Sequence, residues 1–306
     1  MDVLLSYTIL EAKRGSNPYG LFLGIIILMR KLTDYPELDK VFHELAKAYK
    51  DALGDNFVGL YLQGSLAVGD FDMTSDVDFE VIINRDLSDA ELKKIMKVHT
   101  QFRNRDSRWV QHLEYSFFPL PKFTQHSSRY ENGKINDSEE RKLWYFNNGA
   151  RTMEKSDHDN TLVVRWEVRE KGITVLGPDP KSLIGPITPN DLRREIYEFH
   201  VGWTPGFIEN PDQWKNRFFQ VFFVLHFCRA LQDLEEGRIT SKKEAMVWAK
   251  NNLDSKWHDL IDYSWNERKD ENISILQPAN HERWEETLEF AKYILKKVKA
   301  YNQKLT

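Results

Sequence analysis

Two aspartates separated by one residue are the first feature of the sequence that can do chemistry. Asp76 and Asp78 lie at the start of an apolar run, residues 77–83, that has the composition of a β-strand. Successive side chains of a strand alternate between its faces, so both carboxylates point the same way while Val77 faces the core. Such a pair repels itself unless a cation neutralises it, and Mg²⁺ with nucleotide phosphates suits these hard oxygen ligands. The pair is therefore predicted to bind magnesium.

A Gly-Ser pair precedes the aspartates by a fixed spacing. Gly64 and Ser65 follow an apolar run at residues 57–62, and ten residues separate them from Asp76. The glycine lets the backbone approach a ligand, and the serine begins a turn or helix whose free N–H groups can bind phosphate. This spacing matters, because an isolated Asp-x-Asp more often marks a solvated strand edge or a turn cap. A metal site built on histidines is not expected, because the spacing typical of metal ligands is absent at His99, His126, His158 and His226.

A lone glutamate interrupts a third apolar run. If residues 110–118 form a strand, Leu113 and Tyr115 lie on its apolar face and Glu114 lies on the other. A carboxylate in such a strand is costly unless it has a partner. Glu114 is therefore expected either to complete the metal site or to take a proton from an attacking hydroxyl.

The elements that must position these residues begin with a mixture of strands and helices. Thr33 or Asp34 is expected to cap a helix that begins near Pro36, and Ser88 with Glu91 forms a capping-box pattern for a second helix. The expected strands cover residues 57–62, 77–83, 110–118, 162–168 and 173–176. Residues 122–160 are expected to be loop or irregular helix, with residues 142–147 as a candidate short element.

From Thr188 onward only helical patterns follow, after a cluster of glycines and prolines. Thr188 with Asp191 and Ser241 with Glu244 mark two helix starts. Further helices are expected at residues 212–235, 255–268 and 281–302. The fold class is therefore predicted to be α+β. The expected parts are an N-terminal extension at residues 1–28, a small mixed-sheet catalytic domain at 29–178 and an all-helical bundle at 188–306.

Composition narrows the function further. The 306 residues include 43 Lys and Arg against 47 Asp and Glu, a net charge of −4 that disfavours a nucleic-acid partner. Cys228 is the single cysteine, which excludes an internal disulfide and a cysteine-based zinc site and favours a reducing cytoplasm. The apolar residues 21–28 are too few to cross a bilayer, so no membrane association is expected.

At Gly64, Ser65, Asp76 and Asp78 the sequence resembles the polymerase-β-like nucleotidyltransferase superfamily, whose hallmark is a strand, Gly-Ser, and then Asp-x-Asp on the next strand. Within that superfamily the chain is most similar to the aminoglycoside 3″/9 adenylyltransferases, the streptomycin and spectinomycin resistance enzymes. Residues 113–115 match the strand with the family's catalytic base, 174–178 match the end of the first domain, and 227–248 match a signature of the helical domain.

The resemblance implies a magnesium-dependent enzyme that transfers AMP from ATP to a hydroxyl of a small molecule. It implies that Glu114 is the general base and that Arg229 and Lys242 bind the triphosphate. By the same analogy Ser75 contacts the outer phosphates or their metal.

The two cations agree with this assignment on physical grounds. A guanidinium in the apolar helix around Arg229 needs an anion, and the dipole at a helix start disfavours a cation at Lys242. The alternative is that Arg229 pairs with Glu195 or Asp233 while Lys242 is merely solvated.

The segment expected to contact the acceptor departs from the family pattern. The family's acidic drug contact falls on an apolar residue, within an altered stretch at residues 203–219. Trp203, Glu209 and Asp212 are candidate substitutes, with linker and helix-cap roles as the alternative.

Two other functional classes remain open at this point. One is an AMP transferase acting on a protein, of the antitoxin type, and the other is a non-catalytic nucleotide-binding protein. The intact set of Asp76, Asp78 and Glu114 argues against the second class. The sequence leaves the identity of the acceptor and the oligomeric state undetermined.

Overall fold

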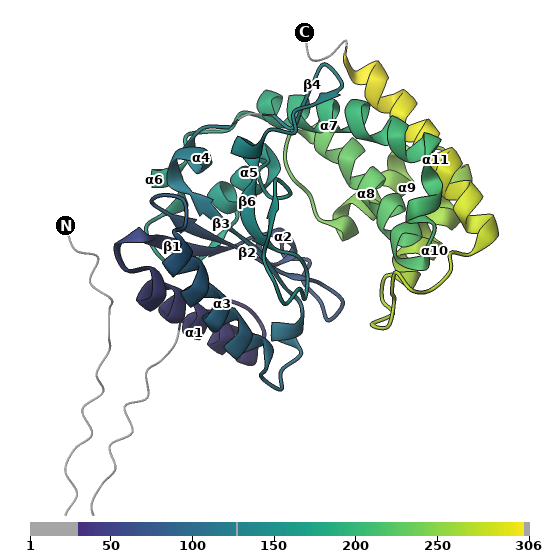
Figure 1. The fold of residues 1–306 in the computed structure, drawn as a ribbon. Helices are drawn as coiled ribbons and strands as arrows, with labels where there is room; N and C mark the ends of the chain where they lie inside the picture. Colours follow the sequence, from purple (N-terminus) through teal and green to yellow (C-terminus); the bar gives the residue numbers. More distant parts are fainter. Residues whose placement is uncertain (1–29, 127, 303–306) are drawn as a thin grey trace, which may run out of the picture.

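A six-stranded mixed sheet lies at the centre of the first half of the protein (Figure 1). The computed structural model describes residues 30–126 and 128–302, so the predicted N-terminal extension lies outside the described residues. The strand order is β7-β6-β3-β2-β1-β8, with β2 and β3 parallel and the other neighbours antiparallel. The strands are β1 (Phe57–Leu62), β2 (Val77–Ile83), β3 (Leu113–Pro119), β6 (Leu143–Phe146), β7 (Glu154–Ser156) and β8 (Ile173–Leu176).

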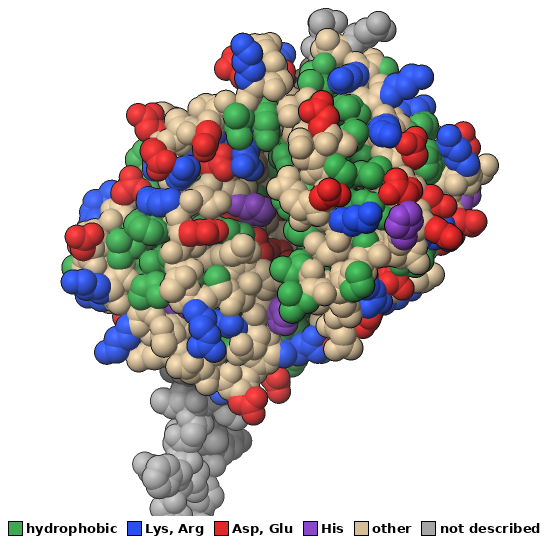
Figure 2. Space-filling model, turned by 45° about the vertical axis from the view of Figure 1, so that its right-hand side comes forward, with side chains coloured by type: hydrophobic (Ala, Val, Ile, Leu, Met, Phe, Trp, Pro, Cys, Tyr) green, Lys and Arg blue, Asp and Glu red, His purple; other side chains and the backbone are tan. Residues whose placement is uncertain are grey.

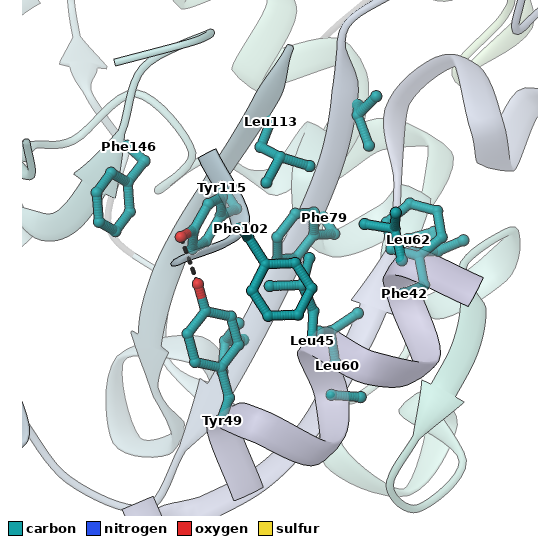
Figure 3. Packing of buried hydrophobic residues seen from close by; sticks show 14 of the residues in the cluster. Phe42, Leu45, Tyr49, Leu60, Leu62, Phe79, Phe102, Leu113, Tyr115 and Phe146 are labelled. Atoms are coloured by element: carbon teal, nitrogen blue, oxygen red, sulfur yellow. Dashed lines mark hydrogen bonds between the residues drawn. The ribbon is translucent and has the colours of Figure 1, made fainter. Parts of the chain in front are cut away.

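Two helices, α1 (Pro36–Leu53) and α3 (Asp89–Arg103), cover one face of this sheet (Figure 1). Aromatic side chains at alternate strand positions point toward them, and Phe79 and Tyr115 pack there with Tyr49 of α1 (Figure 3). The hydroxyl groups of Tyr49 and Tyr115 are hydrogen-bonded at 2.5 Å. Because strand side chains alternate, the same strands carry Asp78 and Glu114 on the opposite face. Burial of one face thus fixes the direction of the carboxylates.

A smaller apolar cluster packs short helices against that opposite face. These helices are α4 (Leu120–Thr124), α5 (Leu162–Glu170) and α6 (Pro180–Leu183). The residues that β2 and β3 contribute to this cluster, Ile82 and Phe118, lie four residues beyond Asp78 and Glu114 in the strand register. The first residues of β2 and β3 are not members of the cluster.

The strand predicted at residues 162–168 is wrong, because these residues form the helix α5. The Thr161 side chain caps the helix by accepting a hydrogen bond from the backbone N–H of Val164 at 3.1 Å. Val164 and Val168 lie one turn apart and pack into the smaller cluster. Arg165 is buried and donates hydrogen bonds to backbone carbonyls of α4. The alternation of charged and apolar residues in this segment resembles a strand, but here one of the charged residues is buried inside the fold.

Other differences concern element boundaries. The stretch at residues 122–160 contains β6, which lies within the candidate short element at residues 142–147. It also contains β7 and a separate hairpin of β4 (Tyr130–Glu131) with β5 (Lys134–Ile135), where loop or irregular helix was expected. The third strand begins at Leu113 because a 3₁₀ turn precedes it. The long helix expected from residue 212 begins at Arg217, where Asn216 caps it.

A bundle of helices forms the second half of the protein (Figure 1). The helix α8 supplies much of its core through side chains such as Phe223, Val224 and Phe227. No helix within the described ranges is long and apolar enough to cross a membrane. The mixed sheet and helical second half confirm the α+β prediction, while the domain boundaries near residues 178 and 188 stay predictions. The bundle consists of α7 (Pro189–Glu209), α8 (Arg217–Glu236), α9 (Lys242–Asn252), α10 (His258–Glu267) and α11 (His281–Tyr301).

The predicted helix caps are mostly confirmed. Ser88 and Thr188 each form a capping box, and Ser241 accepts a hydrogen bond from the backbone of α9. The cap predicted for α1 is wrong, since Tyr35 occupies that position without a side-chain bond. Thr33 instead bonds to the carboxylate of Asp39, which ties the preceding chain to the first turn.

Candidate active site

The parallel pairing of β2 and β3 brings two predicted carboxylates side by side. Asp78 is paired with Glu114 in the strand register, and Asp76 lies one residue before β2. Burial raises the pKa of Asp78 well above its usual value, and the nearby negative charges of Glu114 and Asp76 raise it further. The structure therefore gathers all three predicted carboxylates into one electrostatically strained group.

Glu114 has the environment of a base that operates near neutral pH. Its side chain is 13% exposed. The Tyr145 hydroxyl donates a hydrogen bond to Glu114 Oε1, and His158 Nε2 lies 3.5 Å from the same oxygen. Burial raises the pKa of Glu114 to about 7, although His158 and Tyr145 both act to lower it. A carboxylate with this pKa can accept a proton from a substrate hydroxyl near neutral pH.

Asp76 connects the sheet electrostatically to the helical half. Burial raises the pKa of its carboxyl group, while Lys242 and Arg268 from the helices and His112 from the sheet half act to lower it. The side-chain amide of Asn148 donates a hydrogen bond to Asp76 Oδ1. The aspartate thus faces cations across the space between the two halves, where Figure 2 shows a groove with acidic side chains in its floor.

Gly64 is required by the geometry beside Asp78. Its φ of +60° lies in the left-handed region, and a Cβ at this position would collide with Asp78 Oδ2. Its backbone N–H donates to the carboxylate of the buried Glu167 on α5 at 3.2 Å. Ser65 follows in the first turn of α2 (Gly64–Val68). The predicted Gly-Ser pair therefore lies directly against the carboxylate group.

Ser75 lies in the loop that connects α2 to β2. Its Oγ donates to Asp72 Oδ1 at 3.2 Å and accepts a hydrogen bond from Arg268 Nη2 at 3.3 Å. The serine is thus held immediately before Asp76, as its predicted role requires, and it touches a cation of the helical half that the sequence did not single out.

Arg229 of α8 and Lys242 of α9 lie close to each other and to the aspartates. Burial lowers the pKa of Lys242 to about 8, and the positive charges of Arg229 and Arg268 add to this effect. Asp76 and Asp78 act in the opposite direction. The two predicted triphosphate-binding cations therefore approach the predicted metal ligands from the opposite side of the groove.

The alternative partners proposed for Arg229 are engaged elsewhere. Glu195 accepts hydrogen bonds from His126 and Ser128, and Asp233 accepts two from Thr240. Arg229 interacts with Asp233 and Glu167 through longer-range electrostatics only. Within residues 30–126 and 128–302, neither Arg229 nor Lys242 forms a hydrogen bond or a side-chain ion pair with a protein carboxylate.

Several residues of this site carry no recognisable sequence signal. Tyr145, Asn148 and His158 come from the stretch at residues 122–160, and Glu167 from the helix mistaken for a strand. Arg268 directly follows α10. The pairing of strands and the packing of helices, which the sequence does not display, bring these side chains to the site.

The carboxylate group offers oxygen ligands of the kind that hold a magnesium ion. Oxygen ligands from Asp76 and Asp78 are of the type that Mg²⁺ prefers, and the mutual repulsion that raises the pKa of Asp78 is relieved by a divalent cation. Within the described residues no three His, Cys, Asp or Glu side chains form a complete metal-binding group. Magnesium in nucleotide sites is commonly held by one or two carboxylates together with substrate phosphates. The residues present fit such a site.

The predicted acceptor contacts are not part of this group. Trp203 stacks on Phe207 at 5.5 Å between ring centroids and packs into the bundle core. Glu209 and Asp212 are exposed near the connection between α7 and α8. No described contact links these three residues to Asp76, Asp78 or Glu114, so their acceptor role stays a prediction.

Comparison with known proteins adds independent findings. Residues 182–297 match the family described as aminoglycoside adenylyltransferase, C-terminal domain. Spectinomycin 9-adenylyltransferases from Staphylococcus aureus strains Mu50 and N315 are each 27% identical over 234 residues, covering 71% of this chain and 79% of theirs. A crystal structure of spectinomycin adenyltransferase from Enterococcus faecialis, with ATP and spectinomycin, matches with a TM-score of 0.61 at 16% identity, covering 84% of this chain and 98% of that chain. This last likeness shows a shared fold.

Proposed function

Because this chain is related to the aminoglycoside adenylyltransferases, we propose that it transfers AMP from ATP to a hydroxyl group of an aminocyclitol or aminoglycoside antibiotic. One observation carries the proposal. Asp76, Asp78 and Glu114 at the ends of neighbouring strands face Arg229 and Lys242 from the helical half. A metal-bound triphosphate fits between them, because its cation can contact the carboxylates and its phosphates can contact the arginine and the lysine.

Asp76 and Asp78 are the proposed ligands of Mg²⁺. Bound there, the ion would supply Lewis-acid stabilisation of charge on the triphosphate oxygens. Gly64, Ser65 and Ser75 are proposed to contact the nucleotide, since they adjoin the aspartates in the structure.

Glu114 is the proposed general base. As the acceptor hydroxyl oxygen forms its bond to the α-phosphorus of ATP, the bond to the β-phosphate oxygen breaks and pyrophosphate leaves. The carboxylate of Glu114 takes the hydroxyl proton, and its pKa of about 7 matches this task near neutral pH. Arg229 and Lys242 are proposed to bind the departing pyrophosphate through charge-assisted hydrogen bonds, which their proximity to each other and to the aspartates supports.

Spectinomycin is the first acceptor to test, because the relatives named above act on it. Streptomycin and other hydroxylated cationic drugs follow. A cationic acceptor needs carboxylates along the groove, and we propose that Glu209 and Asp212 contribute charge near its path. The reaction consumes ATP, so its proposed location is the cytoplasm.

Release of pyrophosphate from ATP, magnesium and each drug tests the proposal. Release that requires both the drug and Asp76 supports it, as does resistance conferred on a susceptible bacterium and lost in Asp76→Asn. A folded, ATP-binding protein that releases no pyrophosphate with any aminocyclitol or aminoglycoside would reject the antibiotic as acceptor. Labelling of a protein instead would favour an AMP transferase that modifies proteins.

A further inference from the structure

The loop between α2 and β2 touches the helical bundle at two points. Asp70 Oδ2 accepts a hydrogen bond from the backbone N–H of Lys243 in the first turn of α9 at 3.0 Å. Asp72 forms an ion pair with Arg268, with 2.5 Å between Oδ2 and Nη1. The loop that leads directly into the predicted metal ligands is therefore attached to the helices that carry the predicted triphosphate-binding cations.

Arg268 is well placed beside the predicted nucleotide site. Its side chain is only 12% exposed, and it donates to both carboxylate oxygens of Asp72 and to Ser75 Oγ. Its charge acts on Lys242 and on Asp76, so it lies near both a cation of the bundle and an aspartate of the sheet half. A guanidinium at the end of α10 is also favoured by the helix dipole, which stabilises it in this position.

Three cations from three successive helices thus meet at one side of the groove. Arg229 comes from α8, Lys242 from α9 and Arg268 from the end of α10. Within the described residues Arg268 is the one of the three that has a carboxylate ion-pair partner. That partner, Asp72, is 44% exposed, so the pair is partly screened by solvent. The mutual repulsion of these three cations is therefore only partly offset by Asp72, and an anion with more negative charge would offset it further.

We propose that Arg268 is a third triphosphate-binding cation, and that Asp72 occupies it in the free protein and releases it when the β- and γ-phosphates bind. The inference rests on the proposed function and extends it to a residue to which the sequence analysis gave no role. A triphosphate offers several oxygens to the planar guanidinium and more charge than one carboxylate. Asp72 then acts as a competitor of the nucleotide, while it keeps Arg268 beside Ser75.

This exchange predicts effects of opposite sign for the two partners. Arg268→Gln should weaken the binding of ATP and of inorganic pyrophosphate about tenfold and the binding of AMP less than about twofold, because AMP lacks the outer phosphates. Asp72→Asn should raise ATP affinity about two- to fivefold, because the competing carboxylate is gone, and an unchanged affinity would show that Asp72 does not compete with the nucleotide. The double variant should resemble Arg268→Gln.

Isothermal titration calorimetry of the full chain with ATP, AMP and pyrophosphate, each with magnesium, measures these affinities. Arg108→Gln is the matched control, because it removes another ion pair between the halves, to Glu271, and a bond to the Met73 carbonyl in the loop beside Asp72, without removing a cation of the cluster. It should change all three affinities less than about twofold. If Arg268→Gln folds poorly, the direction in which Asp72→Asn changes the ATP affinity still tests the inference.

Two further results would overturn the inference. In the first, Arg268→Gln binds ATP as tightly as the wild type. In the second, Asp72→Asn weakens ATP as much as Arg268→Gln does, which would make the pair a structural bridge. Both results leave the proposed function intact if the wild type binds ATP. A folded wild-type protein that binds neither ATP nor pyrophosphate would instead reject the proposed function and the inference together.

Discussion

The two halves of the protein carry charge of opposite sign where they face each other. On the sheet side, burial and neighbouring carboxylates raise the pKa values of Asp78 and Glu114. On the helical side, burial and neighbouring cations lower the pKa of Lys242 and of the half-buried His226. Each half is therefore strained by its own charge, and the strain is relieved by a ligand that places a cation against the sheet and an anion against the helices. Direct pairing between the halves, as in the ion pair of Asp72 with Arg268, leaves Asp76, Asp78, Arg229 and Lys242 without such a partner among the described residues.

The largest expected effect comes from the sheet side. Asp78→Asn should lower turnover by about three powers of ten or more, because it removes one of the two proposed magnesium ligands from the carboxylate group. Its thermal stability in the absence of ligands should be unchanged or higher, since the substitution relieves repulsion. Turnover assays and thermal melts check both expectations. Near-normal turnover in Asp78→Asn or Asp76→Asn would remove these residues from the site.

Glu114→Gln separates chemistry from binding. The amide keeps the shape of the side chain but cannot accept the proton, so turnover should fall about 10²–10⁴-fold while the affinity for ATP with magnesium changes little. In the wild type, kcat should rise with pH through about 7, because the deprotonated carboxylate is the active form. That rise should be absent in the variant. Loss of ATP binding together with activity would make Glu114 a metal ligand or a structural residue.

Substitutions on the helical side should act on the outer phosphates. Arg229→Ala and Lys242→Ala should each weaken ATP binding about tenfold or more and AMP binding much less. Lys243→Ala is the matched control, because this neighbouring lysine is exposed and its side chain has no described contact with the site. Calorimetry with both nucleotides measures the difference. Equal losses for ATP and AMP would indicate general destabilisation of the bundle.

The smallest effect concerns a carboxylate that the proposed chemistry does not use. Glu80 is fully buried in β2 with no hydrogen-bond partner on either oxygen, and burial followed by the charges of Asp159 and Asp78 raises its pKa well above normal. Its folded pKa lies above its unfolded pKa, so its contribution to stability is present at low pH and is lost as pH rises above about 4.5.

Glu80→Gln should therefore unfold with nearly the same free energy as the wild type at pH 5 and be more stable by about 1–2 kcal/mol at pH 8. Urea unfolding at the two pH values measures this difference. Turnover should stay within a small factor of the wild type, which also makes the variant a control for Glu114→Gln. A variant destabilised equally at both pH values would show that Glu80 has a packing role instead.

The sequence predicted the carboxylates on the sheet side of the site better than the side chains that contact them. Alternation along two strands is a local property, and it placed Asp76, Asp78 and Glu114 on a shared face because burial of the other face sets the register. Gly64 was likewise predictable from its position after a strand, and the structure adds its contact with Asp78.

The site residues that the sequence did not reveal are brought there by contacts between segments far apart in the chain. Tyr145 and His158 reach Glu114 only because β6 pairs with β3, and Arg268 reaches Ser75 only because α10 lies where the two halves meet. The helix α5 was mistaken for a strand because Arg165, a charged residue expected at the surface, is buried and bonded to α4. Such partners are set by tertiary contacts and leave no periodic trace in the sequence.

The most direct test follows the phosphorus atoms of ATP. Spectinomycin is incubated with the protein, magnesium and ATP labelled at either the α- or the γ-phosphorus, and the label in the drug is measured. The account predicts that the α-label enters the drug, that the γ-label leaves in pyrophosphate, and that Asp78→Asn abolishes the transfer. Transfer of the γ-label to the drug, or no transfer of either label from a folded protein that binds both substrates, would contradict it.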